Sequence, residues 1–492
     1  MPDKFYITTT LPYVNAKPHI GFALEIVQAD VIARWRRARG DEVFFNTGTD
    51  EHGLKIWRKA QELGMDTQAY ADENAARFDD LKRALNLSYN AFIRTTEPRH
   101  VAAAQEFWQR CEQHGDIYKR NYKIKYCVGC ELEKTESELT DGICPIHPNL
   151  ELETIAEENY FFKFSKYQKK LLELYVKNSD FVLPKWRLKE IQNFVAGGLE
   201  DFSISRLKAK MPWGVPVPGD DEHVMYVWFD ALINYISTLG WSVETQNFAS
   251  LQKDKPSTFE KFWGTAKKPN ALQIAGKDNL RQQAAMWQAM LLSAGLPSSK
   301  QILIHGFINS GGQKMSKSLG NVVDPFELVE KYGTDAVRYY LLAEISPFED
   351  GDFTIEKFIV RYNADLANGL GNLVSRVATL LEKDAITLTL TLSPRERGLE
   401  ERINKGMRAY QFNNALKILW DVLRAADETL SRQKPWEIKD LAGKKKILEP
   451  VAQDILNVAE LLQPFLPDTA EKIIKQFSAK QIKKSEGLFP RI

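Results

Sequence analysis

Residues 5–53 carry the sequence FYITTTLPYVNAKPHIGFALEIVQADVIARWRRARGDEVFFNTGTDEHG, and this stretch determines the fold. Its first six residues are aromatic or β-branched, which is typical of a buried strand. After a turn bounded by prolines, apolar side chains recur at helical spacing between residues 24 and 35, and Gly40 is placed to end that helix. Residues 43–45 predict a second strand. A strand, a turn, a helix and a second strand begin a doubly wound parallel sheet.

The composition is that of an ordinary globular protein with several domains. The chain has 492 residues, of which 44% are hydrophobic and 27% charged, and this length exceeds one hydrophobic core. Its formal net charge is +1, so a nucleic-acid partner would be held by local basic patches. No apolar run reaches the length of a membrane span, and the presence of only four cysteines argues against a disulfide scaffold. We therefore expect a cytoplasmic protein with no membrane partner.

The sequence pattern changes twice along the rest of the chain. From about residue 116 to about residue 215 it contains cysteines and hairpin-like segments, and then becomes charged and helical. Strands are predicted again at residues 224–229, 272–275 and 302–305. From about residue 353 onward the apolar residues follow a helical period, which predicts an all-α region. The middle segment is therefore interpreted as an insertion that splits one α/β domain.

Two separated motifs are suited to binding a polyphosphate. Pro18-His19-Ile20-Gly21 opens the predicted helix, where unpaired backbone N–H groups and the helix dipole attract phosphate. Gly21 allows close approach because it has no Cβ, and His19 can donate to a phosphate oxygen. Lys314 and Lys317, in Lys314-Met315-Ser316-Lys317-Ser318, can neutralise the charge on a departing pyrophosphate. The first motif alone could be a capping turn, whereas the second is far more specific.

Three of the four cysteines fall at metal-ligand spacing. Cys127, Cys130, Cys144 and His147 give the pattern C-x2-C-x13-C-x2-H, in which two tight turns can surround one tetrahedral Zn²⁺. All four ligands come from the protein, so the predicted ion is structural and not catalytic. The alternative is a knuckle that folds without metal. Cys111 has no neighbouring partner in the sequence and is predicted to be a buried thiol.

Together these motifs resemble the paired nucleotide-binding motifs of class I aminoacyl-tRNA synthetases. The surrounding residues resemble the methionyl-tRNA synthetase family of the single zinc-knuckle type, over nearly the whole chain. The resemblance implies a methionine–tRNA ligase that activates L-methionine with ATP to methionyl-adenylate and pyrophosphate. It would then transfer the methionyl group to the 3′ terminal adenosine of tRNA(Met), including the initiator. One structural Zn²⁺, Mg²⁺ bound with ATP, and a monomeric state are also expected.

The resemblance assigns a role to individual residues of this chain. The residues implied in catalysis are His19, Lys314 and Lys317. The residues implied in ATP binding are Pro18, His19, Gly21, Gly276, Asp278, Lys314, Ser316, Lys317 and Ser318. The residues implied in methionine binding are Leu11, Tyr13, Asp50, Trp228, Ala231 and Tyr235, with Trp228 expected on a strand. The residues implied in reading the CAU anticodon are Asn372, Arg376 and Trp436.

The implied methionine residues suit their substrate chemically. A thioether is apolar and polarizable and packs well against aromatic rings such as Tyr13 and Trp228. A carboxylate in a dry cleft, here Asp50, is a natural partner for an ammonium group. Taken singly, each aromatic residue could instead belong to the core, and Asp50 could cap a turn.

The sequence departs from the family at three positions. Phe22 stands where the first motif usually has a second histidine, which removes one imidazole donor from the phosphate region. Asn279 and Gln283 stand where isoleucine and histidine are common, near the methionine side chain. Selection of the thioether could therefore use different contacts in this chain.

These departures leave two alternatives open. One is a non-catalytic tRNA-binding paralogue, although such a protein has no need of the lysine motif. The other is a class I synthetase for another apolar amino acid. The isoleucine, valine and leucine enzymes carry a much larger editing insertion than residues 116–215, and a cysteine enzyme would need zinc at the amino-acid pocket. Amino-acid-dependent pyrophosphate exchange would separate these possibilities.

The predicted fold class is α/β. A Rossmann-like catalytic domain with a doubly wound parallel sheet is split by a zinc-bearing insertion and followed by an all-α helical-bundle anticodon-binding domain. The predicted boundaries are 1–115 and 216–302 for the two catalytic halves, 116–215 for the insertion, 303–352 for the lysine-motif and stem-contact region, and 353–492 for the bundle.

Overall fold

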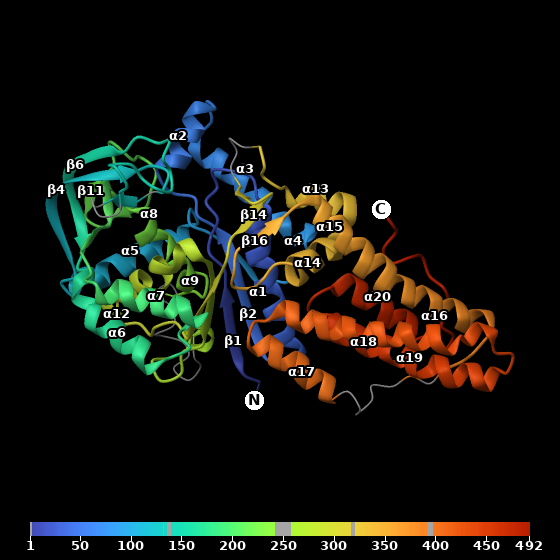
Figure 1. The fold of residues 1–492 in the computed structure, drawn as a ribbon. Helices are drawn as coiled ribbons and strands as arrows, with labels where there is room; N and C mark the ends of the chain where they lie inside the picture. The colour runs from blue at the N-terminus through green and yellow to red at the C-terminus, as the bar shows by residue number, and fades with distance from the viewer. Residues whose placement is uncertain are drawn as a thin grey trace. The chain divides into compact units, whose positions relative to one another are not determined.

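The computed structural model describes residues 2–130, 132–134, 139–241, 257–315, 320–388, 390 and 397–492. The chain forms two compact units (Figure 1). The first comprises Met1–Lys17, Glu42–Asp80 and Tyr89–Ile304, and the second comprises Pro18–Asp41, Leu81–Ser88 and His305–Ile492. Among the residues described, no helix is both long enough and apolar enough to cross a membrane.

A six-stranded sheet forms the centre of the first unit, in the order β3-β2-β1-β12-β13-β7. Its strands are β1 (Lys4–Thr8), β2 (Glu42–Thr49), β3 (Ala91–Arg94), β7 (Val182–Leu183), β12 (Ala271–Gly276) and β13 (Gln301–His305). The ladders β3-β2, β2-β1, β1-β12 and β13-β7 are parallel. The predicted doubly wound parallel sheet is thus confirmed, and β7 adds a strand from the segment predicted to be an insertion.

The sequence of β1 explains its central position. Phe5, Tyr6 and Ile7 are all buried, as expected for a strand covered on both faces. Tyr6 lies opposite Phe44 of β2 and Ala271 of β12. The carboxyl ends of these parallel strands are therefore where a ligand site is expected.

Helices pack around this sheet within the first unit (Figure 1). They are α2 (Leu54–Glu62), α3 (Thr67–Asp79), α5 (Pro98–Gln113), α6 (Gln168–Lys177), α7 (Lys185–Ala196), α8 (Val227–Ala231), α9 (Asn234–Ser237), α11 (Thr258–Phe262) and α12 (Trp287–Ser293), with the short turns η2 (Phe164–Tyr167) and η3 (Lys277–Asn279) and the π-helical turn η4 (Gln282–Met286). Trp108, Trp263 and Trp287 are fully buried in the core of this unit.

Two antiparallel sheets complete the first unit. One has the order β5-β4-β6-β8, and the other has the order β10-β11-β9. Their strands are β4 (Ile117–Cys127), β5 (Leu132–Lys134), β6 (Glu153–Phe162), β8 (Phe202–Ser203), β9 (Ser205–Leu207), β10 (Pro216–Val217) and β11 (Asp220–Met225). The strand predicted at residues 224–229 is wrong: β11 ends at Met225, belongs to an antiparallel sheet, and is followed by helix α8.

The second unit begins with α1 (Ile20–Ala38). The Nδ1 atom of His19 caps this helix by accepting from the backbone N–H of Gly21 at 3.1 Å. Gly40 follows the helix with φ +87°, so the predicted glycine stop is confirmed. Near the middle of α1, Asp30 forms a buried ion pair with Arg338 at 2.8 Å. That arginine belongs to α14 (Thr334–Ala343).

The remainder of the second unit is mainly helical. Its elements are α4 (Leu81–Ala84), β14 (Ile308–Ser310), β15 (Gln313–Lys314), α13 (Pro325–Tyr332), β16 (Gly351–Phe353), α15 (Ile355–Arg361), η6 (Tyr362–Gly371), α16 (Asn372–Lys383), α17 (Arg397–Arg408), α18 (Phe412–Gln433), η8 (Pro435–Glu437), α19 (Leu441–Leu462) and α20 (Pro467–Phe477). Strands β15-β14-β16 form a small sheet. Of the residues described after 353, every regular element is helical, as the sequence predicts.

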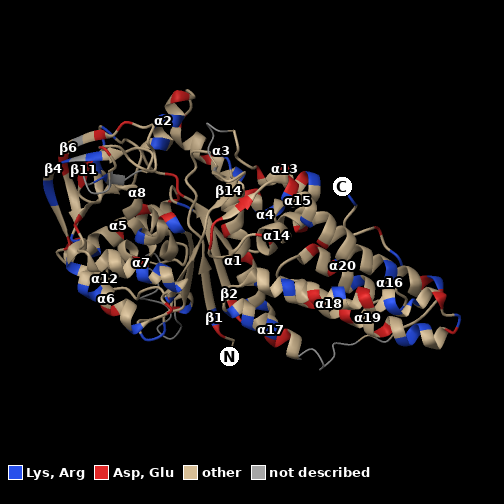
Figure 2. Ribbon diagram, viewed as in Figure 1, with Lys and Arg blue, Asp and Glu red and all other residues tan. Residues whose placement is uncertain are grey.

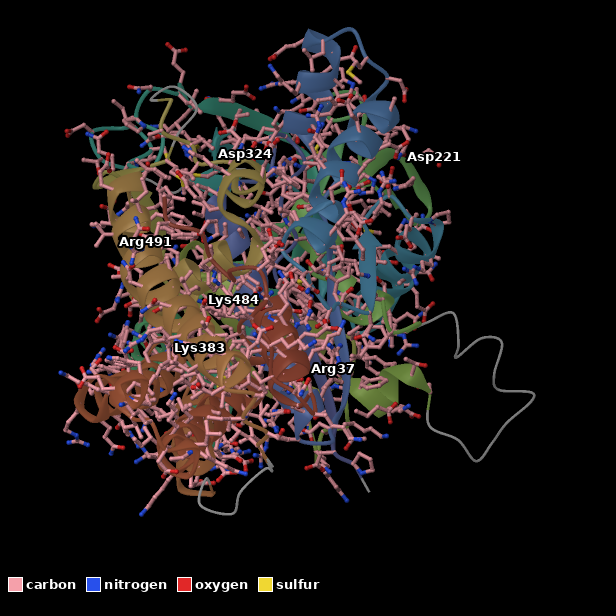
Figure 3. The ribbon with its side chains drawn as sticks, turned by 90° about the vertical axis from the view of Figure 1, so that its right-hand side faces the viewer. Arg37, Asp221, Asp324, Lys383, Lys484 and Arg491 are labelled. Carbon is pink, nitrogen blue, oxygen red and sulfur yellow. The ribbon has the colours of Figure 1, made fainter. Side chains whose placement is uncertain are left out.

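Charge and capping account for the ends and faces of these helices. Lysine, arginine, aspartate and glutamate are interspersed along α18 and α19, opposite their buried apolar faces (Figure 2). Asp324, labelled in Figure 3, caps α13 by accepting from the backbone N–H of Phe326 at 2.8 Å. Lys383, also labelled, is the last residue of α16, where a cation complements the helix dipole.

Candidate active site and metal centre

Tyr13 and Asp50 lie side by side after the first two strands of the parallel sheet. A parallel bridge joins them, because Asp50 donates its backbone N–H to the Pro12 carbonyl at 3.0 Å and accepts from the Val14 N–H at 3.2 Å. The Asp50 side chain is buried. Two residues implied in methionine binding, thirty-seven positions apart in the numbering, are therefore brought together by backbone contacts.

Because residue 53 is a glycine and has no side chain, the Tyr13 side chain has room beside it. A Cβ atom at residue 53 would lie 2.0 Å from the Tyr13 hydroxyl oxygen, and the backbone of Gly53 has φ +121°. Both facts require glycine, the first because of steric overlap and the second because L-residues rarely adopt this conformation.

Glu51 holds the loop that carries Asp50. Arg94 forms a bidentate ion pair with the Glu51 carboxylate, with nitrogen–oxygen distances of 2.7 and 2.9 Å. The hydroxyl groups of Thr49 and Thr96 also donate to this carboxylate, at 2.6 and 2.5 Å. Glu51 is fully buried, and a planar bidentate pair restrains both distance and orientation. The backbone beside Asp50 is therefore rigidly held.

Trp228 and Ala231 lie on the short helix α8, and not on the strand that the sequence predicts. Tyr226, Val227 and Tyr126 form a buried cluster against which Tyr13 and Trp228 pack, together with Val128. We call these six residues the aromatic cluster. The cluster therefore links Tyr126, the residue before Cys127, to Tyr13 and Trp228, which are implied in methionine binding.

Tyr235, on α9, takes part in a buried polar network. Its hydroxyl oxygen accepts a hydrogen bond from the Gln283 side-chain amide at 2.6 Å. The Gln283 amide oxygen in turn accepts from Gln273 at 3.2 Å. Gln283 thus contacts a residue implied in methionine binding. Leu11 is half-buried and Asn279 donates to the Asp278 carboxylate at 3.3 Å.

The sequence pattern assigns no role to His52, His100 or Asp230. In the structure, the two Asp230 oxygens accept from His52 Nδ1 at 2.7 Å and from His100 Nε2 at 2.8 Å. One signal in the sequence could have predicted hydrogen-bond partners here. Asp230 is an acidic residue in the otherwise apolar run 224–233, and a buried carboxylate needs hydrogen-bond partners. The identity of those partners depends on long-range folding.

The residues implied in ATP binding fall in both units. Pro18, His19 and Gly21 surround the start of α1, while Gly276 ends β12 and Asp278 lies in η3. Because His19 Nδ1 accepts from Gly21, the proton of a neutral imidazole is on Nε2, which leaves a donor for an oxygen ligand. Phe22 is half-buried in the first turn of α1.

The lysine motif lies mostly outside the described residues. Residues 316–319 fall there, including Ser316, Lys317 and Ser318. Lys314 is the last residue of β15, which pairs with β14 through Asn309. The structure therefore places the start of the motif at the end of a hairpin in the second unit.

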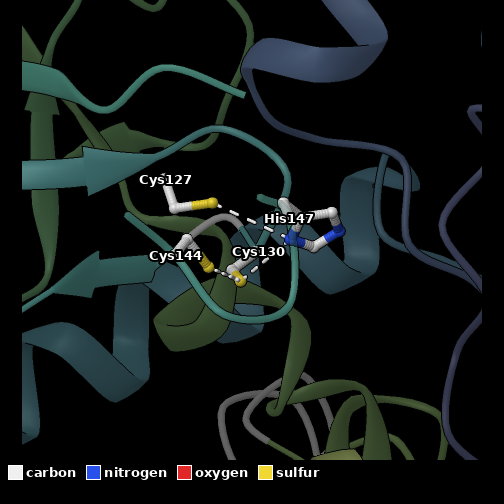
Figure 4. Close-up of side chains that lie close together, drawn as sticks. All are labelled: Cys127, Cys130, Cys144 and His147. Carbon is white, nitrogen blue, oxygen red and sulfur yellow. Dashed lines mark hydrogen bonds between the residues drawn. The ribbon is translucent and has the colours of Figure 1, made fainter. Parts of the chain in front are cut away.

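Cys127, Cys130, Cys144 and His147 converge on one point (Figure 4). Their ligand atoms all lie within 4.8 Å of one another. Cys130 Sγ lies 3.5 Å from Cys144 Sγ and 3.2 Å from His147 Nδ1. A tetrahedral ion with metal–sulfur bonds of about 2.3 Å places its ligands about 3.8 Å apart. The four residues could therefore hold one metal ion.

The backbone of the knuckle also favours metal binding. Burial alone would raise the pKa of the Cys144 thiol, but the backbone N–H groups of His147 and Ile146, together with the side chains of Cys130 and Cys127, lower that pKa overall. A thiolate is the form that binds a metal. At Gly129, a Cβ would lie 2.5 Å from the His147 ring, so glycine is needed for the imidazole to reach this position. Cys111, by contrast, is fully buried and free, as predicted.

The residues implied in anticodon binding meet on one surface of the second unit. Asn372 and Arg376 lie one turn apart on α16. The Arg376 guanidinium lies 5.2 Å from the centre of the Trp436 ring and pairs with Asp427 at 2.7 Å. Trp436, in η8, is 44% exposed. An exposed indole with a guanidinium over it offers a stacking surface for an unpaired base.

Known proteins resemble this chain over almost its whole length. The family model described as "tRNA synthetases class I (M)" matches residues 5–152 and 137–378. The methionine–tRNA ligase of Thermosynechococcus vestitus is 43% identical over 491 residues, covering 97% of this chain and 90% of the relative. That of Mesorhizobium japonicum is 41% identical, covering 96% of this chain and 91% of the relative.

Solved structures of methionyl-tRNA synthetase also resemble this chain over its whole length. Mycobacterium tuberculosis methionyl-tRNA synthetase in complex with methionyl-adenylate superposes with a TM-score of 0.90 at 36% identity, and each chain is covered completely. The apo form of the Mycobacterium tuberculosis enzyme has a TM-score of 0.82 at 33% identity, covering 100% of this chain and 99% of that chain. The chain belongs to the methionyl-tRNA synthetase family of class I tRNA synthetases.

Proposed function

We propose that this protein is a methionine–tRNA ligase. A methionine carboxylate oxygen attacks the α-phosphorus of ATP, and the bond to the bridging oxygen breaks to release pyrophosphate. A hydroxyl of the 3′ terminal adenosine of tRNA(Met) then attacks the methionyl carbonyl carbon, and AMP leaves. The observation that carries the proposal is the buried Asp50 carboxylate beside Tyr13, in a chain whose relatives are named methionine–tRNA ligases.

Within this proposal, two kinds of contact select methionine. Asp50 binds the ammonium group, because a buried carboxylate forms a strong charge-assisted hydrogen bond. Tyr13, Trp228 and Ala231 surround the thioether, together with Leu11. Tyr235 presents its phenol, whose oxygen already accepts from Gln283. Since a phenol has one proton to give, Gln283 directs that proton toward an acceptor other than itself.

The ATP-binding role of the phosphate motifs rests on their charge and on the start of α1. The backbone N–H groups of Phe22 and Ala23 already donate to the His19 carbonyl, so His19 Nε2–H and the positive end of the α1 dipole attract the phosphate oxygens. Pro18 fixes the approach to the helix. Lys314 and Lys317, with Ser316 and Ser318, stabilise the charge that develops on pyrophosphate. Gly276 and Asp278 bind the adenosine. Mg²⁺ accompanies ATP and supplies further charge neutralisation.

Cys127, Cys130, Cys144 and His147 are proposed to hold one Zn²⁺. Three soft thiolates and one imidazole are the ligands that structural zinc prefers. Because the protein supplies all four ligands, the ion stabilises the knuckle and does not bind substrate. The neighbouring Tyr126 packs in the aromatic cluster, so the ion also supports the residues around Trp228.

Asn372, Arg376 and Trp436 are proposed to read the CAU anticodon of elongator and initiator tRNA(Met). The bounds of the five predicted segments, the monomeric state and the cytoplasmic location remain predictions from the sequence.

Charging of tRNA transcripts tests the complete reaction. The protein should esterify tRNA(Met) with methionine in the presence of ATP. A transcript that differs only in having its CAU anticodon replaced should be charged at least about a hundredfold less efficiently, since three bases are misread at about 1–3 kcal/mol each. Equal charging of both transcripts would contradict the proposed anticodon site.

A further inference from the structure

Asp230 occupies an unusual position for a carboxylate. It is fully buried on α8, a helix of five residues that also carries Trp228 and Ala231. Successive helical residues are rotated by about 100°, so Trp228 and Asp230 leave the helix on nearly opposite sides. The carboxylate is therefore directed away from the residues proposed to contact methionine.

Two histidines supply the hydrogen bonds that this buried charge needs. His52 Nδ1 lies 2.7 Å from one Asp230 oxygen, and His100 Nε2 lies 2.8 Å from the other. Burial alone would raise the pKa of Asp230, but the two imidazoles lower it to about 2, so the group is ionised. An ionised carboxylate only accepts, so both imidazoles donate.

The second nitrogen of His100 extends this network. His100 Nδ1 lies 2.9 Å from the Ser237 hydroxyl. His100 therefore uses both ring nitrogens in buried hydrogen bonds, Nε2 with Asp230 and Nδ1 with Ser237. The network thus connects α8 to α5, which carries His100, and to α9, which carries Ser237 and Tyr235.

His52 connects the network to the Asp50 loop. It follows Asp50 by two residues, and its ring packs against Trp213 at 5.6 Å between centroids. Trp213 also donates from Nε1 to the Glu51 carbonyl at 2.5 Å and accepts from the Gly53 N–H at 3.2 Å. These contacts hold the loop in place, and the hydrogen bond from His52 to Asp230 couples the position of the loop to that of α8.

A helix as short as α8 has little stability of its own, so its placement depends on tertiary contacts. The Asp230 carboxylate is a strong contact of this kind, because a buried charge that loses its hydrogen bonds strongly destabilises the fold. It fixes α8 relative to the loop that carries Asp50.

We propose that Asp230 is a positioning residue for methionine, which acts through His52 and His100 to hold Asp50 and the Trp228 helix at a fixed separation. The inference rests on the proposed function, since it assigns Asp50 to the ammonium group and Trp228 to the thioether. One end of the amino acid then binds to the loop and the other end binds to the helix. A displacement of about 1 Å between them weakens methionine binding and adenylate formation by up to about a hundredfold.

The first test is Asp230→Asn. This change preserves the size of the side chain but replaces one acceptor oxygen with an NH2 group, which then faces an imidazole N–H donor. In methionine-dependent pyrophosphate exchange, KM for methionine should rise at least about tenfold, while KM for ATP should change less than about threefold. The matched control is Asp116→Asn. Asp116 is also fully buried in the first unit, and its hydrogen-bond partners Tyr167 (2.5 Å) and Ser293 (2.9 Å) are not among the residues proposed to bind methionine.

A second pair of variants keeps the test valid if Asp230→Asn fails to fold. His52→Asn places an amide nitrogen near the position of Nδ1 and retains the donor, whereas His52→Leu removes it. His52→Asn should keep KM for methionine within about threefold of the original, and His52→Leu should raise it about tenfold or more.

An unchanged methionine KM in His52→Leu, or an equal rise in Asp116→Asn, would overturn the positioning role. Equal rises in the KM for methionine and for ATP would also overturn it, because they would indicate general loosening. Failure of the proposed function has a different signature, because the unmodified protein would then not exchange pyrophosphate with methionine at all.

Discussion

A side chain at residue 53 and the hydroxyl group of Tyr13 would compete for the same space, since a Cβ on Gly53 would lie 2.0 Å from that hydroxyl oxygen. The tyrosine proposed to contact methionine therefore depends on a glycine at the start of α2, forty positions along the chain.

We predict that Gly53→Ala raises KM for methionine in pyrophosphate exchange by about tenfold or more, because Tyr13 must move. Gly219→Ala is the matched control. Gly219 also has a positive φ, of +76°, but its Cβ would meet no atom within 4 Å. Both variants should lose some stability from backbone strain, and only Gly53→Ala should affect methionine. Similar kinetics in the two variants would show that Tyr13 does not contact the substrate.

Lys317→Ala should reduce the rate of adenylate formation by about a hundredfold or more, a typical cost of losing a contact to transition-state charge. Methionine binding, measured by equilibrium dialysis, should change little. Lys331→Ala removes an exposed lysine from α13 and should leave exchange unchanged. Nearly full exchange activity in Lys317→Ala would mean that the lysine motif does not stabilise pyrophosphate.

One zinc ion per chain is expected by elemental analysis of protein purified without added metal. Cys130→Ser should lose the ion, and because Tyr126 packs in the aromatic cluster, it should also weaken methionine-dependent exchange. Cys111→Ala, which alters a buried cysteine outside the knuckle, should retain the metal. A metal-free protein with normal folding and activity would be incompatible with the proposed zinc site.

Trp436→Ala should reduce charging of tRNA(Met) by about tenfold to a hundredfold, because one base-stacking contact contributes about 1–3 kcal/mol. Pyrophosphate exchange should stay within about twofold, since it does not require tRNA. Trp186 of α7 is 51% exposed and provides the control Trp186→Ala, which should charge normally. Equal losses of charging and exchange in Trp436→Ala would instead indicate a folding defect.

Asp30→Asn should destabilise the second unit by about 3–5 kcal/mol, because it leaves the buried Arg338 without its charged partner. Burial raises the pKa of Asp30, but Arg338, Arg34 and Ser88 outweigh burial, so that pKa lies below its ordinary value. A depressed folded-state pKa stabilises the protein above about pH 4, and this contribution is lost as the pH falls through the folded-state pKa. The difference in melting temperature from the unmodified protein should therefore shrink below about pH 4. A difference independent of pH down to pH 2 would contradict this account.

The sequence predicted those features that depend on local pattern. The β1–α1–β2 order follows from aromatic and β-branched residues, helical spacing and Gly40, and the structure confirms it. The ligand spacing likewise predicts the convergence of Cys127, Cys130, Cys144 and His147, because two tight turns require few long-range contacts.

Other features depend on tertiary contacts that a sequence pattern does not contain. Residues 226–229 combine aromatic and β-branched side chains, which favour a strand, and the five residues of α8 are too few to reveal a helical period. Packing instead makes α8 a helix. The contacts of Asp230 with His52 and His100 span 178 and 130 residues, and the bidentate pair of Glu51 with Arg94 spans 43. Each needs the completed fold to bring its partners together.

Pyrophosphate exchange with ATP, measured separately for each of the amino acids, tests the central claim most directly. The account predicts rapid exchange with methionine and at least about a hundredfold lower kcat/KM with leucine, isoleucine, valine and cysteine, because those side chains lack the thioether or the length that the site selects. Exchange with none of the amino acids would identify a non-catalytic paralogue, and preferential exchange with an amino acid other than methionine would contradict the proposed substrate.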